Sequence, residues 1–204
     1  MSPPPATGIV LAGGAASRFG ADKLAVEIDG RPLLHHAVAA VATVVDEVVV
    51  VIAADGARPR LPAGLGVPVR VVRDAAAGLG PLAGLAAGLA GARAPLALVV
   101  GGDQPSLAPT LLAELLLWLG PEADEAALDV VALEEDGRLR PLPSAVRVAT
   151  VRPAAAAALA EGKRSLVGLF ARLRVGTVAG ERWRELDPAG GSLRDIDTRD
   201  DLPR

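Results

Sequence analysis

Residues 8–23 read GIVLAGGAASRFGADK, an apolar run that stops abruptly at a pair of glycines. Uninterrupted apolar residues predict a buried strand, and Gly13 and Gly14 allow the sharp turn that has to follow it. Such a turn leaves backbone N–H groups uncovered, and a series of them forms a concavity that suits phosphate oxygens. Arg18 and Lys23 add two cations to the same loop. We therefore expect a nucleoside triphosphate to bind here, although glycine-rich turns after strands also occur as purely structural features.

The rest of the sequence alternates between strand and helix patterns. Continuous β-branched runs are typical of strands covered on both faces. The patterns predict strands at 7–12, 48–52, 67–72, 96–100, 129–133 and 174–178, and helices at 32–44, 81–92, 107–119, 148–161 and 166–173. Alternation of this kind predicts an α/β fold, a single-domain three-layer α/β/α arrangement around a mostly parallel twisted sheet. We expect residues 1–6 to form a flexible tail and residues 7–204 to form the domain.

Composition excludes several classes of protein. The chain has 204 residues, 51% of them hydrophobic, and a net charge of −3, which is typical of a folded protein with one core. It lacks cysteine, which excludes disulfides and thiolate metal sites. The arginines are scattered, so nucleic acid is not an expected partner. Arg93 and Pro95 split the most apolar stretch, and the first residues lack a secretory signal pattern, so we expect a cytoplasmic protein without a membrane partner.

Two acidic residues follow predicted strands directly. Asp74 comes just after the strand at 67–72, and Asp103 follows the strand at 96–100 through two glycines. Ligands of parallel α/β sheets bind at the carboxyl ends of the strands. Because Mg²⁺ usually takes one or two protein carboxylates besides phosphate and water, Asp103 is a candidate magnesium ligand. The alternative is that Asp103 caps the next helix or holds the turn.

Other conspicuous residues have structural interpretations. Gly84 and Gly88 are expected to let their helix pack closely on the sheet. His35 and His36 have no carboxylate or cysteine at ligand spacing, so we expect them at the surface or in packing contacts. Trp183 is expected in the core or at an interface rather than stacked on a base.

The sequence at 8–23 resembles the L-x-G-G-x-x-x-R-F/M-G-x-D-K signature of nucleotidyltransferases that activate phosphorylated substrates. In particular it resembles the molybdenum cofactor guanylyltransferases, a MobA-like family, and their cytidylyltransferase relatives. Later segments resemble the motifs of that family in the same order: GPLAG at 80–84, GGDQPS at 101–106, GKRSL at 162–166 and RDIDT at 194–198. The resemblance implies a Rossmann-like nucleotidyltransferase (GT-A-like) fold and transfer of a nucleoside monophosphate to a phosphorylated acceptor, with release of pyrophosphate.

The resemblance also implies roles for individual residues. It makes Lys23, Arg18 and Asp103 the catalytic residues, with the two cations on the phosphates. It makes Asp103 a Mg²⁺ ligand and Asp197 a second one. The residues that would bind the nucleotide, the first four of them through the backbone amides of the loop, are Leu11, Ala12, Gly13, Gly14, Lys23, Asp74, Gly80 and Asp103.

Departures from the family pattern leave the substrates open. The guanylyltransferases usually carry an asparagine after the second strand, where this chain has Ala53 and Ala54, and often His-Pro where it has Arg140 and Pro141. We expect GTP and molybdopterin, a phosphorylated pterin. CTP with the same acceptor, or another phosphorylated small molecule, stays open. A nucleotide-binding regulatory module without turnover is a further alternative, against which the presence of Lys23, Arg18 and Asp103 together argues.

Overall fold

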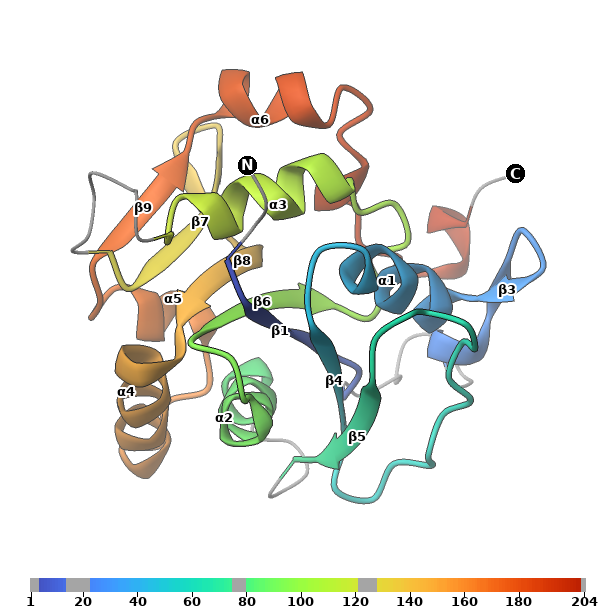
Figure 1. Ribbon diagram of the computed structural model, residues 1–204, viewed down its shortest axis with the longest axis horizontal. Coiled ribbons are helices and arrows are strands. Elements are labelled where there is room, and N and C mark those ends of the chain that lie inside the picture. The colour runs from blue at the N-terminus through green and yellow to red at the C-terminus, as the bar shows by residue number, and fades with distance from the viewer. Residues whose placement is uncertain (1–3, 14–22, 75–79, 121–127, 203–204) are drawn as a thin grey trace.

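The computed structural model describes residues 4–13, 23–74, 80–120 and 128–202 (Figure 1). Its main sheet has seven strands in the order β5-β4-β1-β6-β8-β7-β9. Their bounds are Ala6–Leu11 (β1), Glu47–Ile52 (β4), Val69–Arg73 (β5), Leu96–Gly101 (β6), Val130–Glu135 (β7), Arg138–Arg147 (β8) and Val175–Val178 (β9). A second sheet pairs β2 (Glu27–Ile28) with β3 (Arg31–Pro32).

Helices cover both faces of the main sheet (Figure 1). One face carries α1 (Leu33–Ala42), α3 (Pro109–Leu117) and α6 (Gly180–Leu186). The other carries α2 (Pro81–Gly91), α4 (Val148–Ala160) and α5 (Leu166–Phe170). Short 3-10 helices are η1 (Lys23–Ala25), η2 (Gly191–Leu193) and η3 (Arg199–Asp201). The expected three-layer α/β/α arrangement is confirmed.

The sheet is mostly parallel, as expected, with β8 running antiparallel to both of its neighbours. The sequence pattern did not predict β8, because Pro141 and Pro143 remove two N–H donors from its sequence. The structure accommodates both prolines in a bulge, since pairing with β7 skips from Ser144 to Arg140. The bulge lies within β8, next to the carboxyl end of β6, because the ladder between β6 and β8 stops at Val99 and Ser144.

Smaller differences concern the ends of elements. Helix α1 begins at Leu33 because Pro32 still belongs to β3. Strand β1 includes Ala6, within the segment that we expected to be a tail, and the amide of Ala6 donates to Asp46 Oδ2 at 2.9 Å. Helix α6 was not predicted, but its Trp183 is 2% exposed, which confirms the interpretation of that residue as part of the core.

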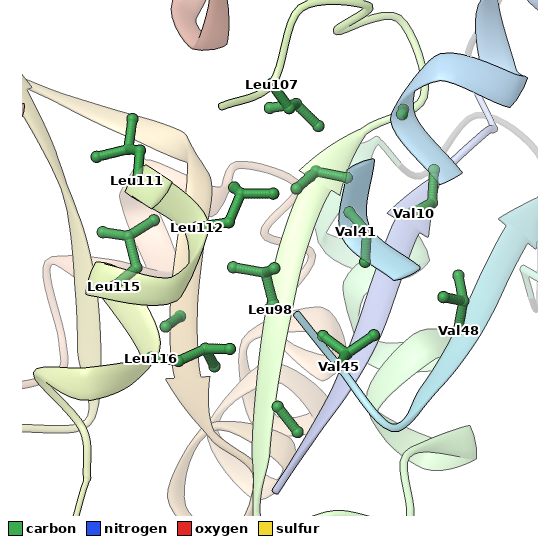
Figure 2. Close-up of a cluster of buried hydrophobic side chains, with 14 of the residues drawn as sticks. Val10, Val41, Val45, Val48, Leu98, Leu107, Leu111, Leu112, Leu115 and Leu116 are labelled. Atoms are coloured by element: carbon green, nitrogen blue, oxygen red, sulfur yellow. The ribbon is translucent and has the colours of Figure 1, made fainter. Parts of the chain in front are cut away.

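The larger core lies between the sheet and the layer of α1 and α3 (Figure 2). In α3, Leu111, Leu112, Leu115 and Leu116 are fully buried, because their spacing places them on one face of the helix. They lie near Leu98 of β6 in Figure 2. Each such side chain contributes about 1.5–3 kcal/mol when buried, so β6 is held on a well-packed layer up to its carboxyl end.

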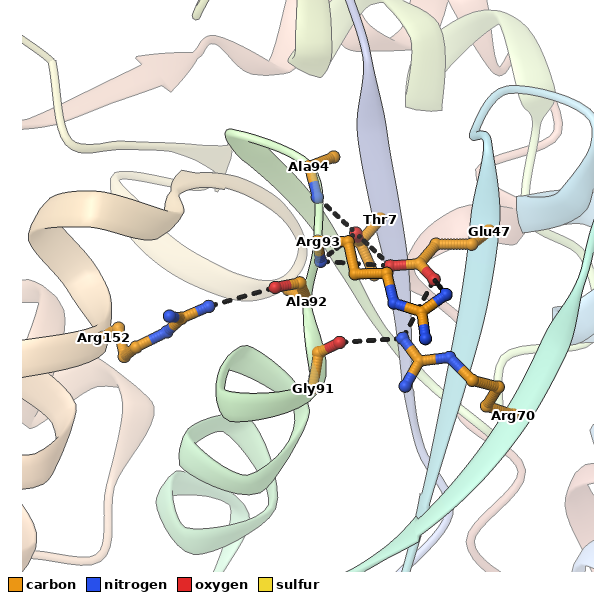
Figure 3. Close-up of polar contacts among 8 residues, drawn as sticks. All are labelled: Thr7, Glu47, Arg70, Gly91, Ala92, Arg93, Ala94 and Arg152. Carbon is orange, nitrogen blue, oxygen red and sulfur yellow. Dashed lines mark hydrogen bonds and ion pairs between the residues drawn. The ribbon is translucent and has the colours of Figure 1, made fainter.

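A buried carboxylate lies at the amino edge of the sheet, the side on which the parallel strands begin (Figure 3). Glu47, at the start of β4, accepts hydrogen bonds from Thr7 Oγ1 and Arg70 Nη2, both at 2.9 Å, and from the amide of Arg93 at 3.1 Å. Burial disfavours its charge, but these bonds outweigh burial and lower the pKa of Glu47. The same Thr7 hydroxyl accepts from the amide of Ala94 at 3.2 Å. These contacts of Glu47 with Thr7, Arg70 and Arg93 form the Glu47 cluster. It joins the strands at their amino-terminal ends.

Within the part of the chain that the structure describes, no helix combines the length and the apolar character needed to cross a membrane.

Candidate active site

The carboxyl ends of β1 and β6 lie side by side in the sheet. From β1 the chain moves outward to β4 and β5, and then returns to β6 on the other side of β1. Open α/β sheets bind ligands at such a reversal, beyond the strand ends. The amide of Gly102 donates to the carbonyl of Leu11 at 2.9 Å and keeps the two ends together. The residues that follow β1 and β6 are therefore neighbours.

Lys23 lies between two carboxylates at this point. Its Nζ is 2.9 Å from Asp103 Oδ2, just beyond β6, and 2.9 Å from Asp197 Oδ1. Asp197 belongs to the C-terminal segment, residues 187–202, and the amide of Ile196 in that segment donates to the carbonyl of Asp103 at 3.0 Å. Asp103 does not cap α3, whose N-cap is Ala108. The structure thus brings together three residues that the sequence analysis selected from separate motifs.

The electrostatics keep the lysine charged. Burial disfavours the charge of Lys23, but the hydrogen bonds and negative charges of Asp197 and Asp103 outweigh burial, so the pKa of Lys23 is raised. Its side chain is 15% exposed, against 31% for Asp103 and 65% for Asp197. Both carboxylates can therefore be reached from solvent while they hold the ammonium group.

A third carboxylate, Asp195, lies close to the first two. Partial burial, in the first place, and the charges of Asp103 and Asp197 raise the pKa of Asp195 to about 6, against the opposing charges of Arg140 and Lys23. Part of the residue still reaches solvent, which screens these charges. The sequence analysis selected neither Asp195 nor Arg140. The spacing D-I-D was a usable signal for Asp195, because alternate residues of an extended segment share a side.

The residues at the end of β1 face the neighbouring strand. Leu11 is the last residue of β1, and the amide of Ala12 donates to the carbonyl of Val51 at 2.7 Å. This amide is used within the sheet, which corrects the expectation that it is free for a phosphate. A Cβ added to Gly13 would lie 3.0 Å from the nitrogen of Ala53, so Gly13 packs directly on the turn after β4.

Asp74 and Gly80 adjoin other elements than the strand that leads to Asp103. Asp74 follows the edge strand β5, three strand spacings from β6, or about 14 Å at the usual spacing of about 4.8 Å. Gly80 precedes α2 with a φ of 78°, and an added Cβ would lie 2.9 Å from the carbonyl oxygen of Arg164, so the position requires glycine. Gly14 and Arg18 lie outside the described residues.

The side chains around Lys23 suit a hard divalent cation. Asp103 and Asp197 offer two carboxylates close enough to share one ammonium group. Among residues 4–13, 23–74, 80–120 and 128–202, no group of three or more Asp, Glu, His or Cys side chains is arranged to hold a metal ion. Mg²⁺ usually binds through one or two carboxylates and completes its shell with phosphate and water. The residues present fit an ion of that kind.

Comparison with known proteins agrees with this geometry. The model of the MobA-like NTP transferase domain matches residues 8–175. A probable molybdenum cofactor guanylyltransferase from Chloroflexus aggregans is 35% identical over 199 residues, covering 96% of this chain and 91% of that protein. The molybdenum cofactor guanylyltransferase of Burkholderia vietnamiensis is 39% identical over 173 residues, 83% of each chain. The crystal structure of molybdopterin-guanine dinucleotide biosynthesis protein A from Archaeoglobus fulgidus has a TM-score of 0.74 at 22% identity and covers 96% of this chain and 94% of that one.

Three findings together define a nucleotidyltransferase. They are the fold, the Lys23 ammonium group between two carboxylates at the point where the strand order reverses, and these matches. The solved structure, at 22% identity, supports the fold alone. The domain model spans most of the chain, and relatives above 30% identity cover it almost from end to end. The chain belongs to the MobA-like NTP transferase family, which confirms the resemblance seen in its motifs.

Proposed function

We propose that this enzyme transfers GMP from GTP to molybdopterin and releases pyrophosphate. The observation that carries the proposal is the convergence of Lys23, Asp103 and Asp197 beyond β6 in a MobA-like NTP transferase. The relatives named molybdenum cofactor guanylyltransferase support the choice of base and acceptor.

The reaction joins two anions. A phosphate oxygen of the acceptor attacks the α-phosphorus of GTP, and the bond from that phosphorus to the bridging oxygen breaks. Pyrophosphate leaves with the electron pair of that bond. Because negative charge collects on the leaving group, positioned cations can supply most of the catalysis. We assign this role to Lys23, with Arg18 of the same loop as a second cation.

We assign Asp103 and Asp197 as the ligands of Mg²⁺. When bound, the ion would neutralise charge on the triphosphate. We assign nucleotide binding to the loop that follows β1 at Gly13 and Gly14, without the Ala12 amide, which donates within the sheet, and to Asp74 and Gly80. Asp74 lies several strand spacings from Asp103, a separation that suits contacts with opposite ends of one nucleotide.

A pyrophosphate-release assay with molybdopterin, Mg²⁺ and each of the four nucleoside triphosphates tests the proposal. We expect turnover with GTP, and we expect GTP to give the largest thermal shift, because a ligand at 100 times its Kd stabilises a protein by about 2.7 kcal/mol. Preference for CTP would make the enzyme a cytidylyltransferase instead. Binding without pyrophosphate release would favour a regulatory module.

The metal assignment has its own test. Asp103→Ala should abolish the Mg²⁺ dependence of triphosphate binding, because the substitution removes one of the two carboxylates next to Lys23. A magnesium titration that matches that of the parent enzyme would contradict the assignment.

A further inference from the structure

The separation of Asp103 and Asp197 has to be set by contacts between two distant parts of the chain. Asp103 follows a strand, whereas Asp197 lies between the short helices η2 and η3. The side chain next to Asp103 joins these parts. Gln104 is 1% exposed, its Oε1 accepts from the amide of Gly101 at 2.8 Å, and its Nε2 donates to the carbonyl of Ser192 at 3.0 Å.

The first of these bonds completes the end of β6. Successive residues of a strand direct their N–H groups to opposite sides. Since Gly102 donates to Leu11 of β1, the amide of Gly101 faces β8. The ladder between β6 and β8 pairs residues only as far as Val99 and Ser144. The side-chain oxygen of Gln104 therefore takes the place of a strand acceptor at the residue that leads into Asp103.

The second bond ends on Ser192, a residue that other contacts hold in place. Ser192 is fully buried, its amide donates to Asp187 Oδ2 at 2.7 Å, and its hydroxyl accepts from the amide of Ala108 at 2.9 Å. The carbonyl that receives Gln104 Nε2 thus belongs to a residue held by two other groups. The Gln104 amide spans the short gap between the end of β6 and the C-terminal segment.

We propose that Gln104 is a positioning residue for the Asp103 and Asp197 carboxylates. This inference rests on the proposed function, because it takes the two carboxylates as metal ligands. A carboxamide suits the position, since one side of the gap requires an acceptor and the other a donor. Partners that orient metal ligands typically change metal affinity by about 10- to 100-fold when they are removed.

Two substitutions distinguish the effects of the two hydrogen bonds that Gln104 makes. Gln104→Met keeps the length of the side chain and removes both hydrogen bonds, whereas Gln104→Glu keeps an oxygen for Gly101 and removes the amide donor to Ser192. We expect both variants to bind Mn²⁺ about 10-fold or more weakly than the parent in the presence of a non-transferable GTP analogue. Electron paramagnetic resonance of free Mn²⁺ gives this affinity without any turnover. In the assay of pyrophosphate release, the Mg²⁺ requirement should rise by a similar factor, with a smaller change in KM for GTP.

Thr7→Val is the matched control, because it also removes buried hydrogen bonds but at the amino edge of the sheet. It should lower Tm without changing Mn²⁺ affinity. The proposal is overturned if either Gln104→Met or Gln104→Glu binds Mn²⁺ as tightly as the parent does. It is also overturned if Thr7→Val lowers Tm as much as the Gln104 variants do and weakens Mn²⁺ binding by the same factor as they do. A parent enzyme that binds Mn²⁺ and nucleotide but never releases pyrophosphate would refute the proposed function alone. A parent that binds neither would overturn both.

Discussion

Lys23 is the residue on which the proposed chemistry depends most, because its ammonium group lies between both candidate metal ligands. Lys23→Met should lower kcat by roughly 10²- to 10³-fold, the usual effect of losing one preorganised charge that stabilises a transition state. Steady-state measurement of pyrophosphate release gives this value. Lys23→Arg, which keeps the charge, should retain more activity than Lys23→Met.

Arg152→Met is a suitable control for the loss of a positive charge. Arg152 lies on α4 near the amino edge, where it donates to the carbonyl of Ala92 at 3.1 Å (Figure 3). It should leave kcat unchanged. Equal activity of Lys23→Met and the parent would remove the lysine from the mechanism.

Helix α2 approaches the sheet through its glycines, as the sequence analysis expected. A Cβ added to Gly88 would lie 2.5 Å from Ile9 Cγ2, whereas one added to Gly84 would lie 3.4 Å from Leu11 Cδ2. Gly88→Ala should therefore lower the free energy of unfolding by about 1–2 kcal/mol, because overpacking outweighs the better helix propensity of alanine. Gly84→Ala should be neutral or stabilise by up to about 1 kcal/mol. Urea unfolding measures both, and the same sign for the two variants would be inconsistent with this packing.

The start of β7 is joined to the start of β9 by an ion pair. The guanidinium of Arg174 donates to Asp129 at 2.9 and 3.0 Å, and its amide donates to the same carboxylate at 3.1 Å. Mainly through the side-chain bonds, and against the effect of burial, Arg174 lowers the pKa of Asp129 from 3.8 to about 2. The stability that the pair contributes is therefore fully present above about pH 4 and is lost as the pH falls through 2.

Asp129→Asn should reveal this dependence. It should cost at most about 2 kcal/mol of unfolding free energy at pH 7, since Arg174 is exposed and solvent screens part of the interaction. The difference from the parent should shrink between pH 4 and pH 2. Urea unfolding at pH 7, 4 and 3 measures the trend, and a difference that stays constant over this range would exclude the ion pair as its source.

Across the whole molecule, the two edges of the sheet have separate tasks. The Glu47 cluster joins the strands at the amino edge. Lys23, with Asp103 and Asp197, lies at the carboxyl edge, the side on which the parallel strands end. Glu47→Ala should cost about 3 kcal/mol of stability, because it breaks a buried ion pair. KM for GTP and the Mg²⁺ requirement of the folded enzyme should stay unchanged. A changed Mg²⁺ requirement in folded Glu47→Ala would show that the edges are coupled.

The sequence was sufficient where a property depends on neighbouring residues. Buried strands, the turn at Gly13 and the acid that follows β6 all have local patterns, and the structure places Asp103 where the pattern predicted it. Tertiary contacts decided the rest. The C-terminal segment docks through contacts that no periodicity marks, among them the bond from Gln104 to Ser192. Helix α6 is too short to be predicted without the burial of Trp183.

The order of the elements along the chain has a consequence for the newly made protein. The seven-stranded sheet is complete at β9, which ends at Val178, whereas Asp197 follows later. The seven strands can therefore pair before the C-terminal segment docks. A newly made chain at that stage of folding should have a complete sheet, while Lys23 still lacks the Asp197 carboxylate as a partner.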